Sequence, residues 1–486
     1  MRVAASFALV LALAAPAAGQ TAHFLFVEPD PTAADEAVPS FRLVTDTARQ
    51  QRLQRWASNE AAALAVELYR QARLVLGPEA AVQAPEDLVV AVMDGEASTG
   101  EGFRLHDRGA SHTWPDAPYL RLGEEEARFG TVLLHEAGHA CIMLLASGRE
   151  LPGTRLAPIP HATPALTDRT TAFCEGFATS LETVLAQRAT APAWRARYHH
   201  DELRFGVIAR MQGEYFRPSG DLVSFAQSLA RHQDVRDNLL AFVSAHSGAD
   251  YLRAQLDPAR DLATLRDANQ LLQSEGFVAS VFYGLFQHGP PPSAAELFAR
   301  VNKVMQAMHD VLSGQTFRAD APWLIEVVQA HARRFPAGRQ EVLSVLLDLS
   351  RGVLVDAGAA DLWRRHYLAA LRQDTDRLEV DAINAARRRW IEAALVDPGV
   401  LGSRLGPQLA CTVPTVIVSL PGMGVRAPLA FDLNTAEEGV LRLVPGISDT
   451  EVARWLAERR RTPFASGDDF RARVTLRPEV LSTLQL

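Results

Sequence analysis

Hydrophobic positions between residues 41 and 146 switch between the alternating spacing of strands and the three-to-four spacing of helices. The strand-like stretches are short and rich in β-branched residues, and turn signals such as Gly77-Pro78 and Asp94-Gly95 separate the segments. This pattern predicts strands at residues 41–44, 88–93 and 119–122, helices at 49–76 and 129–146, and a loop or hairpin at 102–114.

Helical spacing dominates the rest of the chain. It runs from residue 166 to 396, with breaks at the proline-rich stretch 289–292 and at Phe335-Pro336. A β-branched run at 412–420 predicts a strand, and residues 432–486 predict short helices separated by turns. We therefore expect a mainly α chain with a small mixed β-sheet (α+β), divided into residues 1–19, 20–190, 191–397 and 398–486.

Composition and charge exclude several classes of protein. Apolar residues make up 48% of the chain and charged residues 22%, which is typical of a globular protein with a sizeable core. The net charge of −8 provides no general cationic field for nucleic acid or anionic lipid. The three cysteines, Cys141, Cys174 and Cys411, are too few for a disulfide scaffold, although one bridge remains possible.

The first nineteen residues have the pattern of a signal peptide. Arg2 precedes an apolar run at residues 3–15, and small residues suited to cleavage follow at 16–19. The apolar run is too short to span a membrane comfortably, and no later stretch is long enough. We therefore expect a secreted or periplasmic protein with no membrane span.

The helix predicted at 129–146 carries the most informative residues, His135-Glu136-Ala137-Gly138-His139. His135 and His139 are one turn apart on one face, so their imidazoles can bind the same metal ion. Glu136 is offset by one position, beside the metal, where its carboxylate can take a proton from metal-bound water. Burying these polar groups without partners is costly, and a metal ion would satisfy all three.

A catalytic zinc usually takes three protein ligands and leaves a fourth position for water. Glu175 is the preferred third ligand because it lies in the next apolar helix, which Thr167 or Asp168 can cap. Glu182 shares that helix face and could orient a ligand histidine through its second ring nitrogen. Glu275 lies in a similar sequence context and remains an alternative ligand, a residue lining the cleft, or a structural buried acid.

These motifs resemble those of the gluzincin metallopeptidases, which include thermolysin-like and membrane-aminopeptidase-like enzymes. In that clan an HExxH helix is followed by a helix with a Glu ligand, often within Asn-Glu-Gly-Phe-Ala, and this chain has Cys174-Glu175-Gly176-Phe177-Ala178. The resemblance covers residues 41–187. It implies a thermolysin-like region in which His135, His139 and Glu175 bind Zn²⁺ and Glu136 is the general base.

The same resemblance implies a peptide or protein substrate that lies extended along an edge strand at residues 119–122. The Gly-Ala-Met-Glu-Asn motif of the exopeptidases is absent, so amino-terminal trimming is not implied. A hydrolytic site also needs a hydrogen-bond donor for the developing oxyanion. The candidates for this donor are His161, Tyr198, His200 and Tyr215.

Residues 432–486 resemble the helix-hairpin-helix domain of competence-type DNA receptors. Its hairpin is Leu443-Val-Pro-Gly-Ile-Ser448, and the helix predicted at 449–461 follows. In that family the hairpin glycines let backbone N–H groups approach a phosphate. Here Ser448 replaces the second glycine, and Asp449 and Glu451 follow, which disfavours DNA binding.

The sequence therefore predicts an exported zinc peptidase that hydrolyses peptide bonds with metal-activated water. Two alternatives from other classes remain. The first is a surface protein that binds DNA or a protein partner through the helix-hairpin-helix-like segment. The second is a non-catalytic protein that keeps a metal ion for stability.

Overall fold

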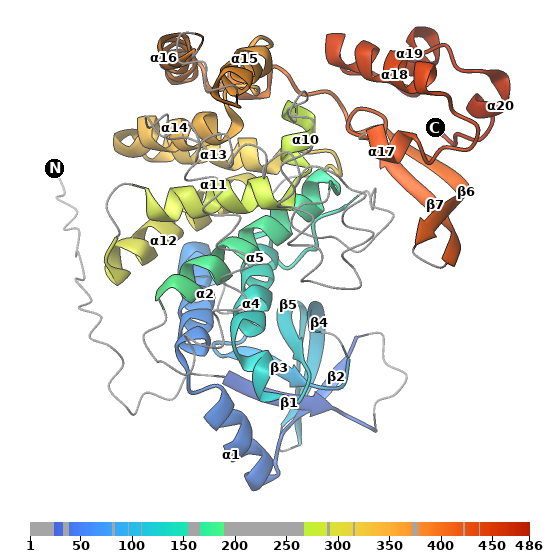
Figure 1. Ribbon diagram of the computed structural model, residues 1–486. Helices are drawn as coiled ribbons and strands as arrows, with labels where there is room; N and C mark the ends of the chain where they lie inside the picture. The colour runs from blue at the N-terminus through green and yellow to red at the C-terminus, as the bar shows by residue number, and fades with distance from the viewer. Residues whose placement is uncertain are drawn as a thin grey trace. The chain divides into compact units, whose positions relative to one another are not determined.

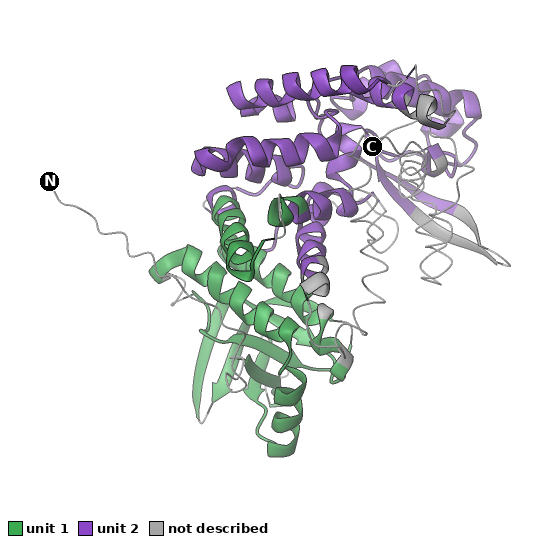
Figure 2. Ribbon diagram, turned by 60° about the vertical axis from the view of Figure 1, so that its left-hand side comes forward, with its two compact units in different colours: residues 1–148, 284–309 green, residues 149–283, 310–486 purple. Residues whose placement is uncertain are grey.

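The computed structural model shows helices and strands in both of the two compact units into which the chain divides (Figures 1 and 2). Unit 1 comprises residues 1–148 and 284–309, and unit 2 comprises residues 149–283 and 310–486. The α+β class expected from the sequence is confirmed, whereas the four-part domain division and the signal peptide stay predictions. The described residues are 24–32, 38–79, 83–95, 97–107, 109–153, 166–188, 267–288, 292–313, 316–371, 377, 379–420, 423–436 and 438–486.

Five strands of unit 1 form a closed barrel in the order β1-β2-β4-β5-β3. The pairs β1–β2 and β4–β5 are antiparallel, whereas β2–β4, β5–β3 and β3–β1 are parallel, so the sheet is mixed as expected. Closure of the sheet was not predicted from the sequence. The strands are β1 (Phe24–Pro29), β2 (Ser40–Leu43), β3 (Leu88–Val92), β4 (Ser98–Asp107) and β5 (Ala110–Leu122).

The β4–β5 hairpin is shaped by aromatic packing and by two glycines. The buried rings of Phe103 and Tyr119 lie 5.7 Å apart in an edge-to-face arrangement. Gly100 leaves room for the Tyr119 ring, because a Cβ at Gly100 would lie 2.3 Å from Cζ of that ring. Gly102 has φ +68° at the β-bulge between Glu101 and Phe103, a conformation that favours glycine.

Two helices replace the single helix expected at 49–76. They are α1 (Thr47–Trp56) and α2 (Glu60–Leu76), and the expected end at Gly77 is confirmed. The break occurs because Asn59 caps α2: its Oδ1 accepts a hydrogen bond from Ala62 N at 3.0 Å, and its Nδ2 donates to Phe129 O at 2.7 Å. The apolar spacing continues across the break, so periodicity alone predicted a continuous helix.

The helix predicted at 129–146 is confirmed as α4 (Thr131–Leu145). Most of its side chains are buried, which accounts for an apolar pattern that is not confined to one face. The chain leaves α4 through Ser147 and Gly148, both with positive φ. A Cβ at Gly148 would lie 1.9 Å from Asp116 O of β5, so the end of α4 approaches the barrel backbone closely.

The helical body expected between 166 and 396 is confirmed wherever that region is described. Among the described helices, none is long and apolar enough to cross a membrane. The division between the units falls within α11 and α12. The helices are α5 (Arg169–Arg188), α10 (Ala268–Leu272), α11 (Glu275–Gln287), α12 (Ala294–Leu312), α13 (Trp323–Arg334), α14 (Arg339–Ser350), α15 (Ala359–Leu371) and α16 (Val380–Val396).

Within unit 2, buried hydrogen bonds join the start of α5 to α10 and to residues 398–486, called the C-terminal segment below. The Arg169 guanidinium donates to Asn269 Oδ1 at 3.0 Å and to Gly406 O at 2.6 Å. Gln273 Nε2 donates to Asp432 Oδ2 at 2.6 Å. Breaking one partner of such a network leaves another polar group buried and unsatisfied, so the C-terminal segment is an integral part of this unit.

The C-terminal segment contains a hairpin followed by short helices around its own core. Trp455 and Phe470 are fully buried, with ring centroids 4.5 Å apart. The helix predicted at 449–461 is confirmed. The likeness of residues 432–486 to a DNA-binding domain stays a prediction. The elements are β6 (Ala410–Leu420), β7 (Met423–Asp432), α17 (Glu438–Leu441), α18 (Asp449–Arg461), α19 (Gly467–Arg473) and α20 (Pro478–Leu481).

The N-terminus of α18 is capped by Ser448, the last residue of the 443–448 hairpin, and by Glu451. Ser448 and Glu451 form a capping box, in which each side chain bonds the backbone N–H of the other residue. Arg477 donates to Glu451 from its backbone N at 2.8 Å and from its guanidinium at 3.1 Å. The Arg477 guanidinium, followed by the Ser448 hydroxyl, lowers the pKa of Glu451 to about 2.

Glu451→Gln should lower stability at neutral pH and remove part of the acid sensitivity of the protein. The ordinary pKa of the carboxyl is 4.5, so its ionised form stabilises the native state above pH 4.5, and this stabilisation is lost as the pH falls toward 2. Glutamine keeps the cap but not the charge. Urea unfolding should show a lower midpoint for Glu451→Gln at pH 7 and a difference that shrinks between pH 4.5 and 2. A constant difference across that range would contradict the assignment.

Candidate metal centre

The two histidines of α4 direct their imidazoles toward the same point. His135 Nε2 and His139 Nε2 are 3.0 Å apart, and the ring planes are inclined by 72°. Both side chains are half-buried, although most of their neighbours on α4 are fully buried. The spacing of one helical turn therefore has the effect predicted from the sequence, because it brings two ring nitrogens together on one face of α4.

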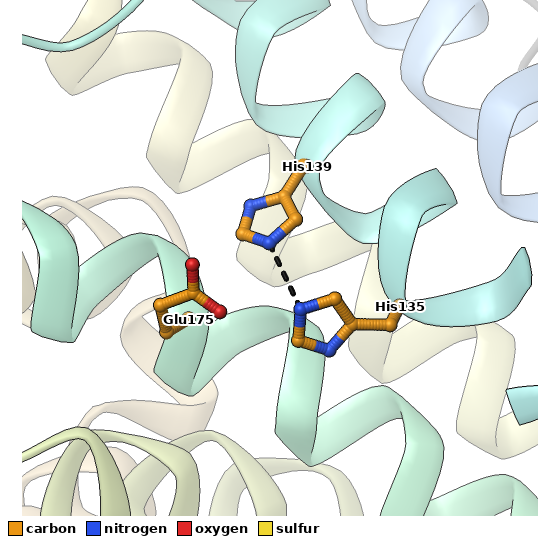
Figure 3. A group of neighbouring side chains, drawn as sticks. All are labelled: His135, His139 and Glu175. Atoms are coloured by element: carbon orange, nitrogen blue, oxygen red, sulfur yellow. Dashed lines mark hydrogen bonds between the residues drawn. The ribbon is translucent and has the colours of Figure 1, made fainter. Parts of the chain in front are cut away.

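Glu175 of α5 completes a group of three potential ligands. One ligand atom from each of His135, His139 and Glu175 lies within 4.8 Å of the other two. Figure 3 shows the imidazoles on successive turns of one helix and the Glu175 carboxylate, from a second helix, directed toward them. All three residues are half-buried, so the group combines a protected position with access to solvent.

The donor set fits a divalent metal ion. Two imidazole nitrogens and a carboxylate oxygen are ligands that zinc commonly takes, at about 2.0–2.2 Å. Nitrogens bound to a tetrahedral ion at that distance lie about 3.3 Å apart, close to the 3.0 Å between the two Nε2 atoms. A neutral imidazole can offer Nε2 as a lone-pair donor when its proton is on Nδ1. The chemistry of the three side chains therefore suits a divalent ion.

The local sequence of α5 fixes the position of Glu175 within unit 2. Asp168 caps the helix, since its Oδ1 accepts hydrogen bonds from Thr170 N at 3.0 Å and Thr171 N at 2.9 Å. This confirms one of the two caps expected from the sequence. A Cβ at Gly176 would lie 2.7 Å from Val278 Cβ and 2.9 Å from the backbone N of Ala279. Gly176 therefore permits the close approach of α5 and α11.

Glu136, next to His135 on α4, is buried, with 6% of its surface exposed. Its Oε2 accepts a hydrogen bond from Thr99 Oγ1 of β4 at 2.9 Å. The residues of β4 were not among the site residues expected from the sequence. Thr99 lies in a polar, glycine-containing stretch whose pattern gives no indication of the contact, and only the folded hairpin brings it to α4.

The alternative ligand Glu275 lies outside the group of three. It is 4% exposed at the start of α11, and its Oε1 is 3.5 Å from Thr179 Oγ1 of α5. Thr179 is one turn beyond Glu175, so Glu275 contacts α5 one turn further along the helix than Glu175. Glu182 is also buried, and its role in orienting a histidine stays a prediction.

The expectation that residues 119–122 form a free edge strand for the substrate is wrong. Leu120 pairs with Thr99 of β4 on one side and with Val90 of β3 on the other, so this part of β5 has no free edge. Among the described strands, residues 98–101 of β4 pair with β5 alone, because β2 pairs only with residues 104–106 of β4. Barrel closure thus leaves residues 98–101 of β4, not residues 119–122 of β5, with a described strand on one side only.

The remaining expectations are settled only in part. The four candidate oxyanion donors, His161, Tyr198, His200 and Tyr215, lie outside the described residues. The three cysteines are free, so they form no bridge with one another. Burial raises the pKa of the Cys141 thiol well above its usual range, and Cys141 therefore stays protonated on α4, two residues after His139.

Comparisons of the chain with protein-family models, curated proteins and solved structures give no match. The resemblance to the gluzincins therefore depends on the sequence motifs of the two helices alone.

Gly176→Ala should weaken both the fold and the metal site. The added methyl group would clash with Val278 and with backbone at Ala279, and relief of the clash would displace α5 and Glu175. We expect the free energy of unfolding to fall by about 1–3 kcal/mol, as in other overpacked cores. The affinity for Zn²⁺, measured by titration, should fall as well.

Gly338→Ala is the matched control in the same unit, because no atom lies within 4 Å of a Cβ at that position. Its free energy of unfolding should change by no more than about 0.5 kcal/mol. Equal stability and Zn²⁺ affinity in Gly176→Ala and the wild type would show that the close approach of α5 and α11 does not position the site.

Proposed function

We propose that this protein is an exported zinc-dependent peptidase. The observation that carries the proposal is the pair of converging imidazoles on α4, with the buried carboxylate of Glu136 one position along the same helix. A zinc ion bound there would polarise the peptide carbonyl and make a water molecule acidic enough to attack it. The exported location rests on the signal-peptide pattern of residues 1–19.

The ligand count favours a catalytic site over a structural one. Structural zinc sites usually have four protein ligands, whereas catalytic sites have three and an open position. Among the described residues, His135, His139 and Glu175 make three, and each is half-buried. His₂Glu ligation is known in zinc peptidases. This arrangement supports a hydrolase rather than a protein that keeps the ion for stability.

Glu136 is the proposed general base. It follows His135 directly, and in HExxH metal sites the glutamate at this position acts as the general base instead of as a ligand. In the proposed reaction the carboxylate takes a proton from the attacking water and delivers it to the leaving amine. One group can perform both transfers because the first leaves it in the acid form that the second requires.

The side of residues 98–101 of β4 that has no described strand partner supports an extended peptide as the substrate. Residues 98–101 pair with only one described strand, and Thr99 within them contacts Glu136. A peptide added to a free strand edge gains backbone hydrogen bonds without regard to its side chains. We propose that the substrate lies along this part of β4.

The contacts of the C-terminal segment support a structural role more than DNA binding. Arg442, next to the hairpin, makes ion pairs with Glu438 and Asp449. The N-terminus of α18 is already capped by Ser448 and Glu451. The negative charge of Glu451 would oppose a phosphate. The buried bonds of Gln273 to Asp432 and Thr435 join the segment to α10.

Glu136→Gln tests the proposed mechanism. Glutamine has nearly the same size but cannot accept the proton, so Zn²⁺ binding should persist while turnover of a peptide library falls by about 10²–10⁴-fold. Products can be measured by mass spectrometry. Glu125→Gln is the control, because Glu125 is 71% exposed in the segment before α4, and it should retain wild-type turnover. Wild-type turnover in zinc-loaded Glu136→Gln would remove Glu136 from the reaction.

A further inference from the structure

Thr99 makes an unusual pair of contacts with Glu136. Its Oγ1 lies 2.9 Å from Glu136 Oε2 and 2.9 Å from Glu136 O, so one hydroxyl contacts both the carboxylate and the backbone of the same residue. Among the described residues, no other hydrogen bond to the Glu136 carboxylate is found. Because Glu136 is only 6% exposed, water cannot readily replace this partner.

The hydroxyl is held in place by the barrel. Thr99 pairs with Leu120 of β5, and Leu120 also pairs with Val90 of β3. Leu120 is completely buried. Next to Thr99, Gly100 has no side chain, so the ring of Tyr119 can lie against the strand without displacing it. The Thr99 side chain is therefore presented to α4 by a strand fixed through its neighbours.

The chemistry of the contact suits a proton carrier. A threonine hydroxyl has one donor and two acceptor sites, so it can donate to a carboxylate and accept from a carboxylic acid. The contact with Glu136 can thus persist with or without the transferred proton. Because Thr99 binds Oε2, it leaves Oε1 of the same carboxylate available for a proton.

We propose that Thr99 is a positioning residue that holds the Glu136 carboxylate in the orientation needed for proton transfer. The proposal rests on the proposed function, since it assigns Thr99 a role through the general base. It requires a hydroxyl at position 99, so serine should serve and valine should not. Valine has nearly the same shape as threonine, which separates the loss of the hydroxyl from a loss of packing.

The experiment compares wild type, Thr99→Val, Thr99→Ser and Glu136→Gln. All should bind Zn²⁺ with the same stoichiometry. We expect kcat on a cleaved peptide to fall about 10- to 100-fold in Thr99→Val, as for a lost hydrogen bond to a charged group, with KM changed less than about twofold. Thr99→Ser should stay within about threefold of wild type. Adding Thr99→Val to Glu136→Gln should cause no further loss, because the two residues act as one unit.

Thr113→Val is the matched control, because Thr113 is exposed on the same hairpin and its hydroxyl accepts a hydrogen bond from Arg104 Nε at 3.1 Å. It should keep wild-type kcat. A readout independent of turnover is the crystal structure of the metal-free protein. The Glu136 carboxylate should keep its place in Thr99→Ser and leave it in Thr99→Val.

Wild-type kcat in Thr99→Val, or an unmoved Glu136 carboxylate in its crystal structure, would overturn the positioning role while leaving the proposed function intact. A wild-type protein that binds Zn²⁺ but cleaves no peptide would instead overturn the proposed function, and the catalytic role of Thr99 with it. The two failures are therefore distinguishable.

Discussion

The constraint on which the structure depends is the presence of two imidazoles and a carboxylate on the apolar helix α4. Polar groups removed from water cost free energy unless they find partners, and a charged carboxylate costs most. The fold accommodates them differently. His135 and His139 remain half-buried, with their nitrogens turned toward each other, whereas Glu136 is buried and bonded to Thr99. Such an arrangement is expected when polar residues are retained for chemistry.

Contacts within each unit position the side chains of the candidate site. The barrel provides the hydroxyl for Glu136, through a hairpin whose shape depends on Gly100 and Gly102. In unit 2, the contact between Gly176 and α11 sets the position of α5 and thus of Glu175. The start of α5 is joined to α10 and the C-terminal segment through Arg169, so much of unit 2 supports the helix that carries Glu175.

Local sequence predicted the convergence of the two histidines better than it predicted the sheet. The helix spacing brought His135 and His139 together, and the apolar surroundings of Glu175 indicated a second buried helix, because both features depend on residues close in sequence. Barrel closure depends on pairing between distant strands, and hydrophobic alternation carries no information about the partner. The same limitation explains why residues 119–122 were expected at an edge and why the contact of Thr99 was missed.

The most direct test of the central claim is equilibrium titration of the metal-free protein with Zn²⁺. We predict one equivalent bound by the wild type, with affinity weakened by about 100-fold or more in Glu175→Gln and unchanged in Glu275→Gln. The absence of Zn²⁺ binding by the folded wild type would contradict the account. So would a loss of affinity in Glu275→Gln together with normal binding by Glu175→Gln, because the structure groups Glu175 with the two imidazoles.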